Sequence, residues 1–584
     1  MTLSGWLQIL VFFVLLVAIT PVLGGYMARV FTGETVVLSR VLGPVERGIY
    51  RLIRVDVKRG QDWKSYAVSL VLFSLAGWVL LYLILRTQTI HPFNPQGYHS
   101  MPWNVAVNTV TSFLTNTNWQ YYSGETTLSY FSQMAGLTVQ NFVSAAVGIV
   151  VVVALIRGII GRSGKELGNF WQDLVRTVLY VLLPIAVIGA LVLVSQGVIQ
   201  TLGHYLSFSG LTGLGGHIAV GPVASQEVIK NLGTNGGGFF NANAATPFEN
   251  PNGFTNMLEP LLQFSIPAAL TATYGRMVGS RRQGWALFAA MSVMFFAGFA
   301  VLYGAEAHGT PAQHAAGLHT HVYAGSTGGN MEGKEQRLGV AGSALFDNVA
   351  TDTSTGAVDS AFDSLTGLGG AVPMANLGTG EVIFGGVGSG LYIMLLYVLL
   401  AMFLGGLMVG RTPELLGKKI EAREIKLAVL GLLTTPLVAL STTAIAIADH
   451  AGRASIFNSG PQGFSETFYA YLSQSNNNGS AFAGYTGFVQ PNAGSIGSHG
   501  VTFADLLGSF DLAFARYVPI LFVLAVAGSL AGKRVAPAGL GTMRSDNPTF
   551  VVLLIAVIIL VGALTFFPAL LLGPIVQSLT GHLY

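Results

Sequence analysis

Four short polar segments decide the fold of this chain: TNTNWQ at 115–120, GTNGGG at 233–238, TSTGAV at 353–358 and SNNNGS at 475–480. They interrupt an otherwise apolar sequence and are rich in threonine, asparagine, serine and glycine. Equivalent positions lie 118, 120 and 123 residues apart when measured between Thr117, Asn235, Thr355 and Asn478. Because a near-constant period indicates internal repetition, the chain is predicted to hold four copies of one structural unit.

The composition is that of a membrane protein. Charged residues make up 9% of the 584 residues, against about 25% in soluble domains. Hydrophobic residues make up 52%, and the mean hydropathy is +0.59. So few charges could not cover the surface of a soluble protein of this size, and a net charge of +3 gives no indication of nucleic-acid binding. The absence of cysteine excludes disulfides and thiolate metal sites.

Apolar runs of about 20 residues can cross a bilayer as helices. We expect ten crossings, near 4–26, 66–86, 134–156, 174–197, 256–278, 284–304, 381–409, 426–448, 506–531 and 549–574. The first run follows MTLSGW, which lacks the basic start of a signal peptide, so it is interpreted as a retained helix rather than a cleaved signal.

Basic residues set the expected orientation. Most of the 29 lysines and arginines fall in alternate connections, at 27–65, 157–176, 276–282, 411–426 and 533–544. The positive-inside rule makes those connections cytoplasmic. Both termini then face outward, which agrees with ten crossings because an even number places both termini on the same side.

The polar segments all belong to outward connections, so we expect four pore loops that enter from one face. Two crossings separate neighbouring loops, which makes the repeats parallel rather than inverted. A short amphipathic stretch precedes each loop, at 104–114, 222–232, 343–351 and 463–474. These stretches fit half-helices whose C-terminal ends carry partial negative charge. Four such ends aimed at one axis favour a cation there.

The composition of the loops favours K⁺ among cations. A dehydrated ion needs oxygens in place of its water, and backbone carbonyls supply them without net charge. Glycine and asparagine permit the unusual backbone angles that this requires. None of the four polar runs contains Asp or Glu within its core, and Asp352 and Asp359 only flank the third. This argues against a ring of carboxylates for divalent ions.

A family resemblance emerges from longer motifs. Residues 231–253, NLGTNGGGFFNANAATPFENPNG, closely resemble the second pore loop of the potassium-binding subunit of Kdp-type potassium-transporting ATPases. TNTNWQYYSGE at 115–125, LMVGRTPELLGKKIE at 407–421 and NNNGSAFAG at 476–484 are similar to the same family. Residues 305–342, which include a histidine-rich stretch, and the lengthened 485–501 depart from its leaner members.

The resemblance implies an all-α fold like that of the Trk/Ktr/HKT transporters, with four helix–pore loop–helix repeats around a pseudo-fourfold axis and one extra helix at each end. The units expected are 1–63, repeats at 64–160, 161–282, 283–420 and 421–540, and a final helix at 541–584. It also implies a bacterial inner-membrane subunit that takes K⁺ from outside and passes it through an intramembrane tunnel. The implied partners are a P-type ATPase subunit, a single-span subunit and a very small membrane peptide.

By motif, the resemblance places the K⁺ ligands in the four loops. They are Asn116, Thr117 and Asn118; Thr234, Asn235 and Gly236; Thr353, Ser354, Thr355 and Gly356, where the match is less sharp; and Asn477, Asn478 and Gly479.

Other features carry two interpretations each. Arg516, inside an apolar run, is interpreted as a barrier to free inward leakage of K⁺, and the alternative is an ion pair with Asp511. The glycines of 385–390 and 405–406 indicate either a broken helix forming a gate or close helix packing. Glu249 and Glu259 could attract cations or cap loops. The histidines 308, 314, 319 and 321 are interpreted as a solvated loop rather than a metal site.

The chain is predicted to bind no nucleotide. GKK at 417–419 lacks the serine or threonine and the spacing of a phosphate-binding loop, and no phosphorylation motif of the DKTGT kind occurs. Three rivals remain: a Trk/Ktr-like transporter working without ATP, a symporter built from inverted repeats, and a channel-like scaffold without transport.

Overall fold

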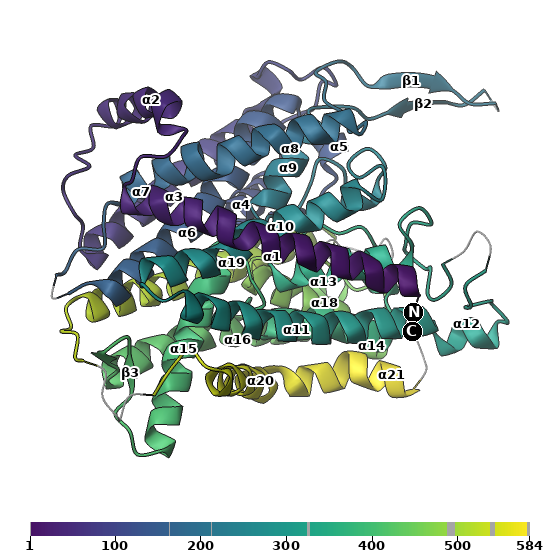
Figure 1. The fold of residues 1–584 in the computed structure, drawn as a ribbon. Helices are drawn as coiled ribbons and strands as arrows, with labels where there is room; N and C mark the ends of the chain where they lie inside the picture. Colours follow the sequence, from purple (N-terminus) through teal and green to yellow (C-terminus); the bar gives the residue numbers. More distant parts are fainter. Residues whose placement is uncertain are drawn as a thin grey trace.

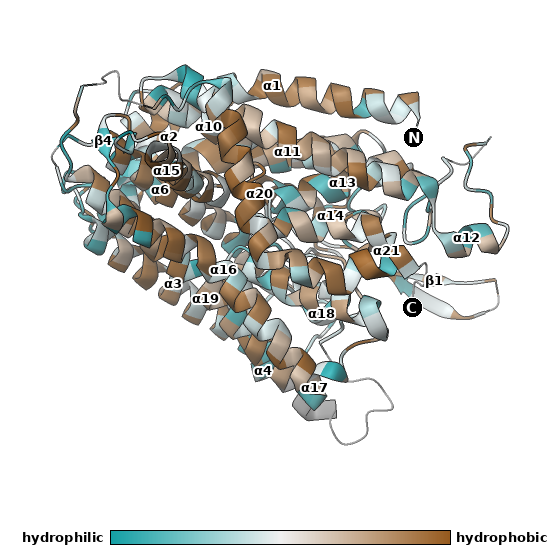
Figure 2. Cartoon of the chain, turned by 90° about the horizontal axis from the view of Figure 1, so that it is seen from below, coloured by the Kyte–Doolittle hydropathy of each residue, from teal (hydrophilic) through white to brown (hydrophobic). Residues whose placement is uncertain are grey.

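The computed structural model describes residues 2–162, 164–211, 213–323, 327–487, 497–537 and 543–580, with the side chains of 497–502 left out. The protein is mostly helical, and its long helices run side by side (Figure 1). The start of α1 and the end of α21 lie at the same end of this bundle. Apolar residues predominate along the helices, and polar residues gather at the ends (Figure 2).

Nine helical segments in the described part of the chain are long and apolar enough to cross a membrane. They comprise α1 (Leu3–Thr32), α3 (Trp63–Arg86), α6 (Val139–Ile160), α7 and α8 (Phe170–Arg176 and Leu183–Ser195), α11 (Arg281–His308), α15 (Ser389–Met408), α16 (Ala422–Ala448), α19 (Gly497–Ala531) and α20 (Pro548–Leu570). The chain is therefore an integral membrane protein.

The tenth expected crossing coincides with α10 (Thr255–Met277), a helix of 23 residues that falls outside the apolar set. Its polar residues Asn256, Glu259 and Gln263 are all buried. The helix packs along α1, so closely that a Cβ on Gly24 would lie 2.7 Å from the Cβ of Ala272. Because protein rather than lipid surrounds α10, its sequence need not be apolar throughout.

A short helix precedes each polar loop, as predicted. These helices are α4 (Trp103–Leu114), α9 (Val223–Leu232), α13 (Gly339–Asp352) and α18 (Gly460–Ser475). The shortest has 10 residues and the longest 16. All four are too short to cross about 30 Å of hydrocarbon, so each ends inside the protein, at the loop that follows it.

The expected helix over 381–409 is wrong in its first part. Helix α14 (Gly367–Gly378) ends and α15 begins at Ser389, and the ten residues between them are not helical. Glu381 and Phe384 adopt φ values of 60° and 62°, which a right-handed helix excludes. Gly388 packs against Gly148, where a Cβ would lie 2.6 Å from the nitrogen of Ile149. The glycines therefore break the helix here and also allow close packing.

The remaining elements are short. They are α2 (Ser39–Leu52), α5 (Gly124–Thr127), α12 (Pro311–Ala315), α17 (His450–Arg453), α21 (Val576–Thr580), and two hairpins, β1 (Leu206–Ser209) with β2 (Gly215–Ile218) and β3 (Glu414–Leu415) with β4 (Lys418–Lys419). The histidine-rich stretch includes the end of α11 and α12, where His308 and His314 are exposed. Of the lengthened segment 485–501, residues 488–496 lie outside the described residues.

The basic asymmetry predicts that the α2 segment and the α12 loop lie on opposite sides of the membrane. Because the chain has no cysteine, single substitutions Lys58→Cys, just after α2, and Leu318→Cys can be labelled, and both positions are exposed. In intact cells, a membrane-impermeant maleimide should label Leu318→Cys only, and both after permeabilisation. Labelling of both before permeabilisation contradicts the orientation.

Candidate functional site

All four short helices end in the same local structure. The residue after each helix cap is left-handed, with φ of 72° at Asn116, 48° at Thr234, 54° at Ser354 and 54° at Asn477. The next N–H donates to the carbonyl five residues earlier, at Thr117 to Ser112, Asn235 to Lys230, Thr355 to Ala350 and Asn478 to Ser473, over 2.8–3.0 Å. This is the Schellman ending, which normally uses glycine at the left-handed position.

Three of the four left-handed residues, Asn116, Thr234 and Asn477, have side chains that hold neighbouring segments. A non-glycine residue there costs about 1–2 kcal/mol. Asn116 Nδ2 donates to the carbonyl oxygens of Gly233 and Thr234, at 3.1 and 2.9 Å. Thr234 Oγ1 accepts from the N–H of Val387, at 2.9 Å, in the non-helical break before α15. Three of the four strained positions therefore join the loops to their surroundings.

Hydrogen bonds connect the four loop regions in a closed ring. Asn116 joins the first loop to the second. The N–H of Val358, after the third loop, donates to Asn243 Oδ1, after the second, at 3.4 Å. Asn478 Nδ2 of the fourth loop donates to the Ala350 carbonyl, at the end of the third short helix, at 2.9 Å. Asn477 Nδ2 closes the ring by donating to Thr117 Oγ1, at 3.0 Å.

Glycines let the loops meet at the centre of this ring. A Cβ on Gly236 would lie 2.8 Å from the Asn478 carbonyl oxygen and 2.9 Å from the Gly479 Cα, and would overlap the Thr117 carbonyl oxygen. A Cβ on Gly356 would lie 2.6 Å from the Gly236 Cα. These distances are shorter than any carbon side chain tolerates. The carbonyl oxygens of Thr117 and Asn478 thus lie at the meeting point of all four loops.

The constraint at Gly236 is steric. Gly236 was expected to adopt an unusual backbone conformation, but left-handed φ values occur instead at its neighbours Thr234 and Gly237, at 48° and 62°. Gly236 is required because its Cα faces three other loops, so that there is no room for a side chain.

Asparagine and threonine side chains brace the loops from behind. Asn118 Nδ2 donates to Asn141 Oδ1 of α6, at 2.8 Å, and Asn235 Nδ2 donates to the Asn141 carbonyl oxygen, at 3.2 Å. In the third loop, the hydroxyls of Thr353 and Thr355 lie 2.7 Å apart. Twelve of the thirteen predicted K⁺ ligands are buried, and Gly479 is half-buried. The third loop, whose sequence matches least sharply, therefore has the same architecture as the others.

A cavity of about 360 Å³, which we call the outer cavity, lies on the side of the loops that carries the residues following each polar run. Asn118, Gly237, Gly356 and Gly479 contribute to its floor, one from each loop. None of the residues that line it is acidic or basic. An ion entering this cavity would meet neutral oxygens rather than carboxylates.

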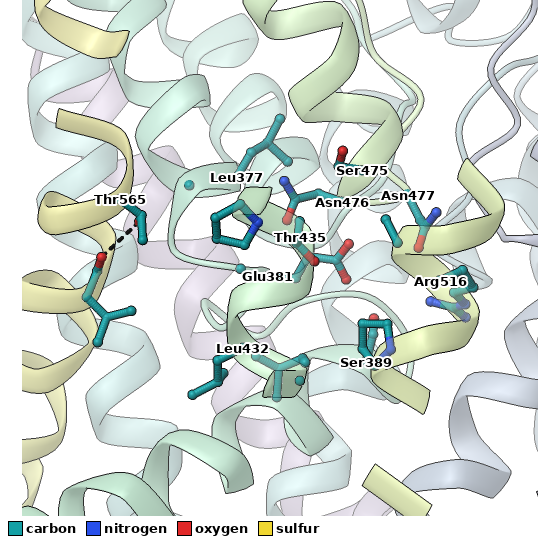
Figure 3. Close-up of a pocket in the computed structure, with 18 of the residues that line it drawn as sticks. Leu377, Glu381, Ser389, Leu432, Thr435, Ser475, Asn476, Asn477, Arg516 and Thr565 are labelled. Atoms are coloured by element: carbon teal, nitrogen blue, oxygen red, sulfur yellow. Dashed lines mark hydrogen bonds between the residues drawn. The ribbon is translucent and has the colours of Figure 1, made fainter. Parts of the chain in front are cut away.

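A second cavity, of about 30 Å³, which we call the inner cavity, lies beside the end of α18 and holds two opposite charges. Asn477 lines it together with Glu381 and Arg516, which are 6% and 5% exposed (Figure 3). The two charged groups face this cavity without forming an ion pair among those of the described residues. Asp511, the alternative partner of Arg516, accepts a hydrogen bond from Ser475 instead.

Glu381 is the functional candidate that the sequence interpretation missed. It was assigned to the start of a long apolar helix, whereas it lies in the break before α15 with a left-handed backbone. A lone acidic residue inside the glycine-rich stretch 378–390 was the available signal.

A buried charge cluster supports the second loop. Lys230 Nζ lies 2.6 Å from Glu227 and 3.2 Å from Glu249, and all three side chains are buried. Burial alone lowers the pKa of the Lys230 ammonium, but the Glu227 and Glu249 carboxylates outweigh it and raise that pKa. Burial, and then the Glu227 carboxylate, raise the pKa of Glu249 to about 8. Glu249 also accepts from the N–H of Phe240, at 2.9 Å, and so caps the loop.

Comparison with known proteins assigns this chain to a family. The family described as Potassium-transporting ATPase A subunit matches residues 10–579. The chain belongs to this family. Three curated relatives, each named potassium-transporting ATPase potassium-binding subunit, come from Mesorhizobium japonicum, Brucella anthropi and Methylorubrum extorquens. They are 52%, 54% and 53% identical and cover 99–100% of this chain and 98–99% of their own.

One solved structure, the potassium transporter TrkH from Vibrio parahaemolyticus, aligns with a TM-score of 0.49 and 14% identity. The alignment covers 79% of this chain and 84% of that one.

The buried cluster yields a stability prediction. Replacing Lys230 by methionine leaves Glu227 and Glu249 buried without their cation, and breaking a buried pair in this way costs about 3–5 kcal/mol. Thermal unfolding in detergent should therefore occur at a clearly lower temperature. Lys419→Met, at a side chain that is 66% exposed, is the control and should change little. Equal unfolding temperatures for the two variants contradict the assigned role of Lys230.

Proposed function

We propose that this chain binds K⁺ between its four polar loops and delivers it to an ATP-hydrolysing partner for uptake into the cell. The observation that carries the proposal is the closed ring of loops, with the Thr117 and Asn478 carbonyl oxygens at its centre. K⁺ is selected when oxygens of suitable number and field strength replace its water. The neutral outer cavity supports a monovalent rather than a divalent ion.

The full ligand set we propose comprises the residues assigned from the four motifs. They are Asn116, Thr117, Asn118, Thr234, Asn235, Gly236, Thr353, Ser354, Thr355, Gly356, Asn477, Asn478 and Gly479. In the finer fold we propose, α10 completes ten crossings, and four parallel repeats surround a pseudo-fourfold axis with one extra helix at each end. Family membership and the common ending of the four short helices support this arrangement.

Arg516 serves in this proposal as a barrier on the inner side of the loops. A buried guanidinium repels a cation that would otherwise continue straight into the cytoplasm. Glu381, on the same cavity, offsets that charge and gives the ion a place to leave the axis. The cavity is also lined by Thr565 and Phe566 of α20. A tunnel toward α20, gated by the break before α15, is the route we propose.

The partners we propose are a P-type ATPase subunit, a single-span subunit and a very small membrane peptide, in a bacterial inner membrane with both termini outward. The names of the relatives, which specify one subunit of an ATPase, support the existence of such a complex. The chain itself binds no nucleotide in this proposal. K⁺-stimulated ATP hydrolysis should require the assembled complex, and hydrolysis by the isolated chain, free of contaminants, contradicts the assignment.

Gly236→Asp tests the ion site. The new carboxylate would strain the loop and add a strong-field ligand, so apparent K⁺ affinity should fall, and Rb⁺ or Na⁺ should stimulate ATP hydrolysis more readily than in the unaltered complex. A tenfold change in selectivity needs only about 1.4 kcal/mol. Gly253→Asp is the control, because a side chain at Gly253 meets nothing within 4 Å. An assembled Gly236→Asp complex with unchanged affinity and ion ranking would falsify the assignment.

Arg516→Ala tests the barrier. Loss of the buried positive charge should let K⁺ leak through reconstituted complexes without ATP, or uncouple hydrolysis from uptake. Arg516→Lys keeps the charge and should restore coupling at least in part. K⁺ flux into proteoliposomes, measured with and without ATP, separates these outcomes. Normal coupled transport by folded Arg516→Ala complexes contradicts the barrier.

A further inference from the structure

Helix α2 presents three distinct faces. Successive residues of a helix turn by about 100°, which places Leu42, Glu46, Ile49 and Tyr50 toward one side. Leu42, Ile49 and Tyr50 pack against Val175, Leu179 and Tyr180. This first face holds α2 to the rest of the protein.

The second face of α2 is apolar and uncovered. Val41, Val45 and Leu52 lie within about 40° of one another around the helix. They are 71%, 49% and 83% exposed, and Val37, just before the helix, is 89% exposed. A stripe of this kind on a helix facing water alone would be unfavourable at about 25 cal/mol for each Å².

The third face is basic. Arg40, Arg47 and Arg51 also lie within about 40° of one another, about 120° away from the apolar stripe. Arg54 follows directly after the helix. None of these four guanidinium groups forms an ion pair or a side-chain hydrogen bond with another described residue. The one acidic residue of the helix, Glu46, points inward and binds Arg176, Tyr50 and Tyr180 instead.

The contacts of Glu46 fix the level of α2 along the helix bundle. Glu46 accepts a hydrogen bond from Tyr180 Oη, at 2.6 Å, and the Tyr180 carbonyl accepts one from Tyr26 Oη, at 2.9 Å. Tyr26 lies six residues before the end of α1, which is about 9 Å along the helix. Helix α2 therefore lies beside the last turns of a membrane helix rather than beyond them, at the end of the bundle opposite the start of α1 (Figure 1).

We propose that α2 lies in the surface of the cytoplasmic leaflet, with Val41, Val45 and Leu52 among the acyl chains and its arginines on the headgroups of anionic phospholipids. Amphipathic helices with an apolar stripe and basic flanks bind membranes in this way. The tyrosines at 26, 50 and 180 lie at the same level, where aromatic side chains gather at membrane interfaces. The cytoplasmic side rests on the proposed orientation, whereas the membrane contact does not.

A depth measurement tests this assignment. The cysteine-free chain allows a nitroxide at Val45→Cys in the intact complex, reconstituted into vesicles of phosphatidylcholine with phosphatidylglycerol in both leaflets. Collision rates with oxygen and with a water-soluble nickel chelate give its depth. Leu75→Cys, 56% exposed on α3, is the lipid reference, and Lys58→Cys is the aqueous reference. The label at Val45 should lie about 5–10 Å below the phosphates.

Varying the charge of the lipid provides a second part of the experiment. In phosphatidylcholine alone, the Val45 label should lie closer to water, and exchanging all four arginines for glutamine should have the same effect in anionic vesicles. A label as exposed to nickel as that at Lys58 overturns the proposal. So does a label shielded from both reagents, which would indicate that a protein partner covers α2. If the variant with four glutamines does not fold, the comparison of the two lipid compositions can still be made on the protein with its native arginines, and it still tests the proposal. Because both leaflets carry the same lipids, none of these outcomes depends on the orientation or on K⁺ binding.

Discussion

The structure depends on four helix ends held at one point by hydrogen bonds between them. Each short helix stops inside the protein, where no bulk water can satisfy its last carbonyl groups. The Schellman ending satisfies part of this need within each loop. Asparagine side chains at Asn116, Asn477 and Asn478 satisfy more of it between loops. This ring fixes where each short helix ends. The long helices are therefore arranged around it.

The distribution of charge follows from the same constraint. The loops and the outer cavity carry neutral oxygens, so that in the proposed function an ion there would be held by dipoles rather than by a carboxylate. Full charges lie one layer away. Lys230 with Glu227 and Glu249 braces the second loop from behind, and Arg516 and Glu381 line the inner cavity. In the proposed function, charges placed there would act on the ion without competing with the carbonyl oxygens for it, because they do not reach the centre of the ring.

The sequence predicted much of this architecture for physical reasons. A period near 120 residues and polar runs after short amphipathic stretches located the four loops, because few other structures place such runs inside a membrane. Prediction from the sequence failed where tertiary packing overrides the local sequence pattern. Residues 381–388 are apolar enough for a helix, yet Gly388 packs against Gly148 of α6 and the helix breaks. The steric constraint at Gly236 is imposed by three loops that are distant in the sequence, so no local sequence pattern could reveal it. Likewise, Arg516 and Glu381 are 135 residues apart in the chain and share a cavity only in the fold.

The central claim is that K⁺ binds at the meeting point of the four loops. Diffraction from crystals of the complex in K⁺, recorded near the absorption edge of potassium, locates the ion by its anomalous scattering. The account predicts a peak within ligand distance of the carbonyl oxygens of Thr117 and Asn478, and its loss when K⁺ is replaced by an ion that does not stimulate ATP hydrolysis. A peak found only beside carboxylates, at Glu381 or at Glu249, with none between the loops, would contradict it.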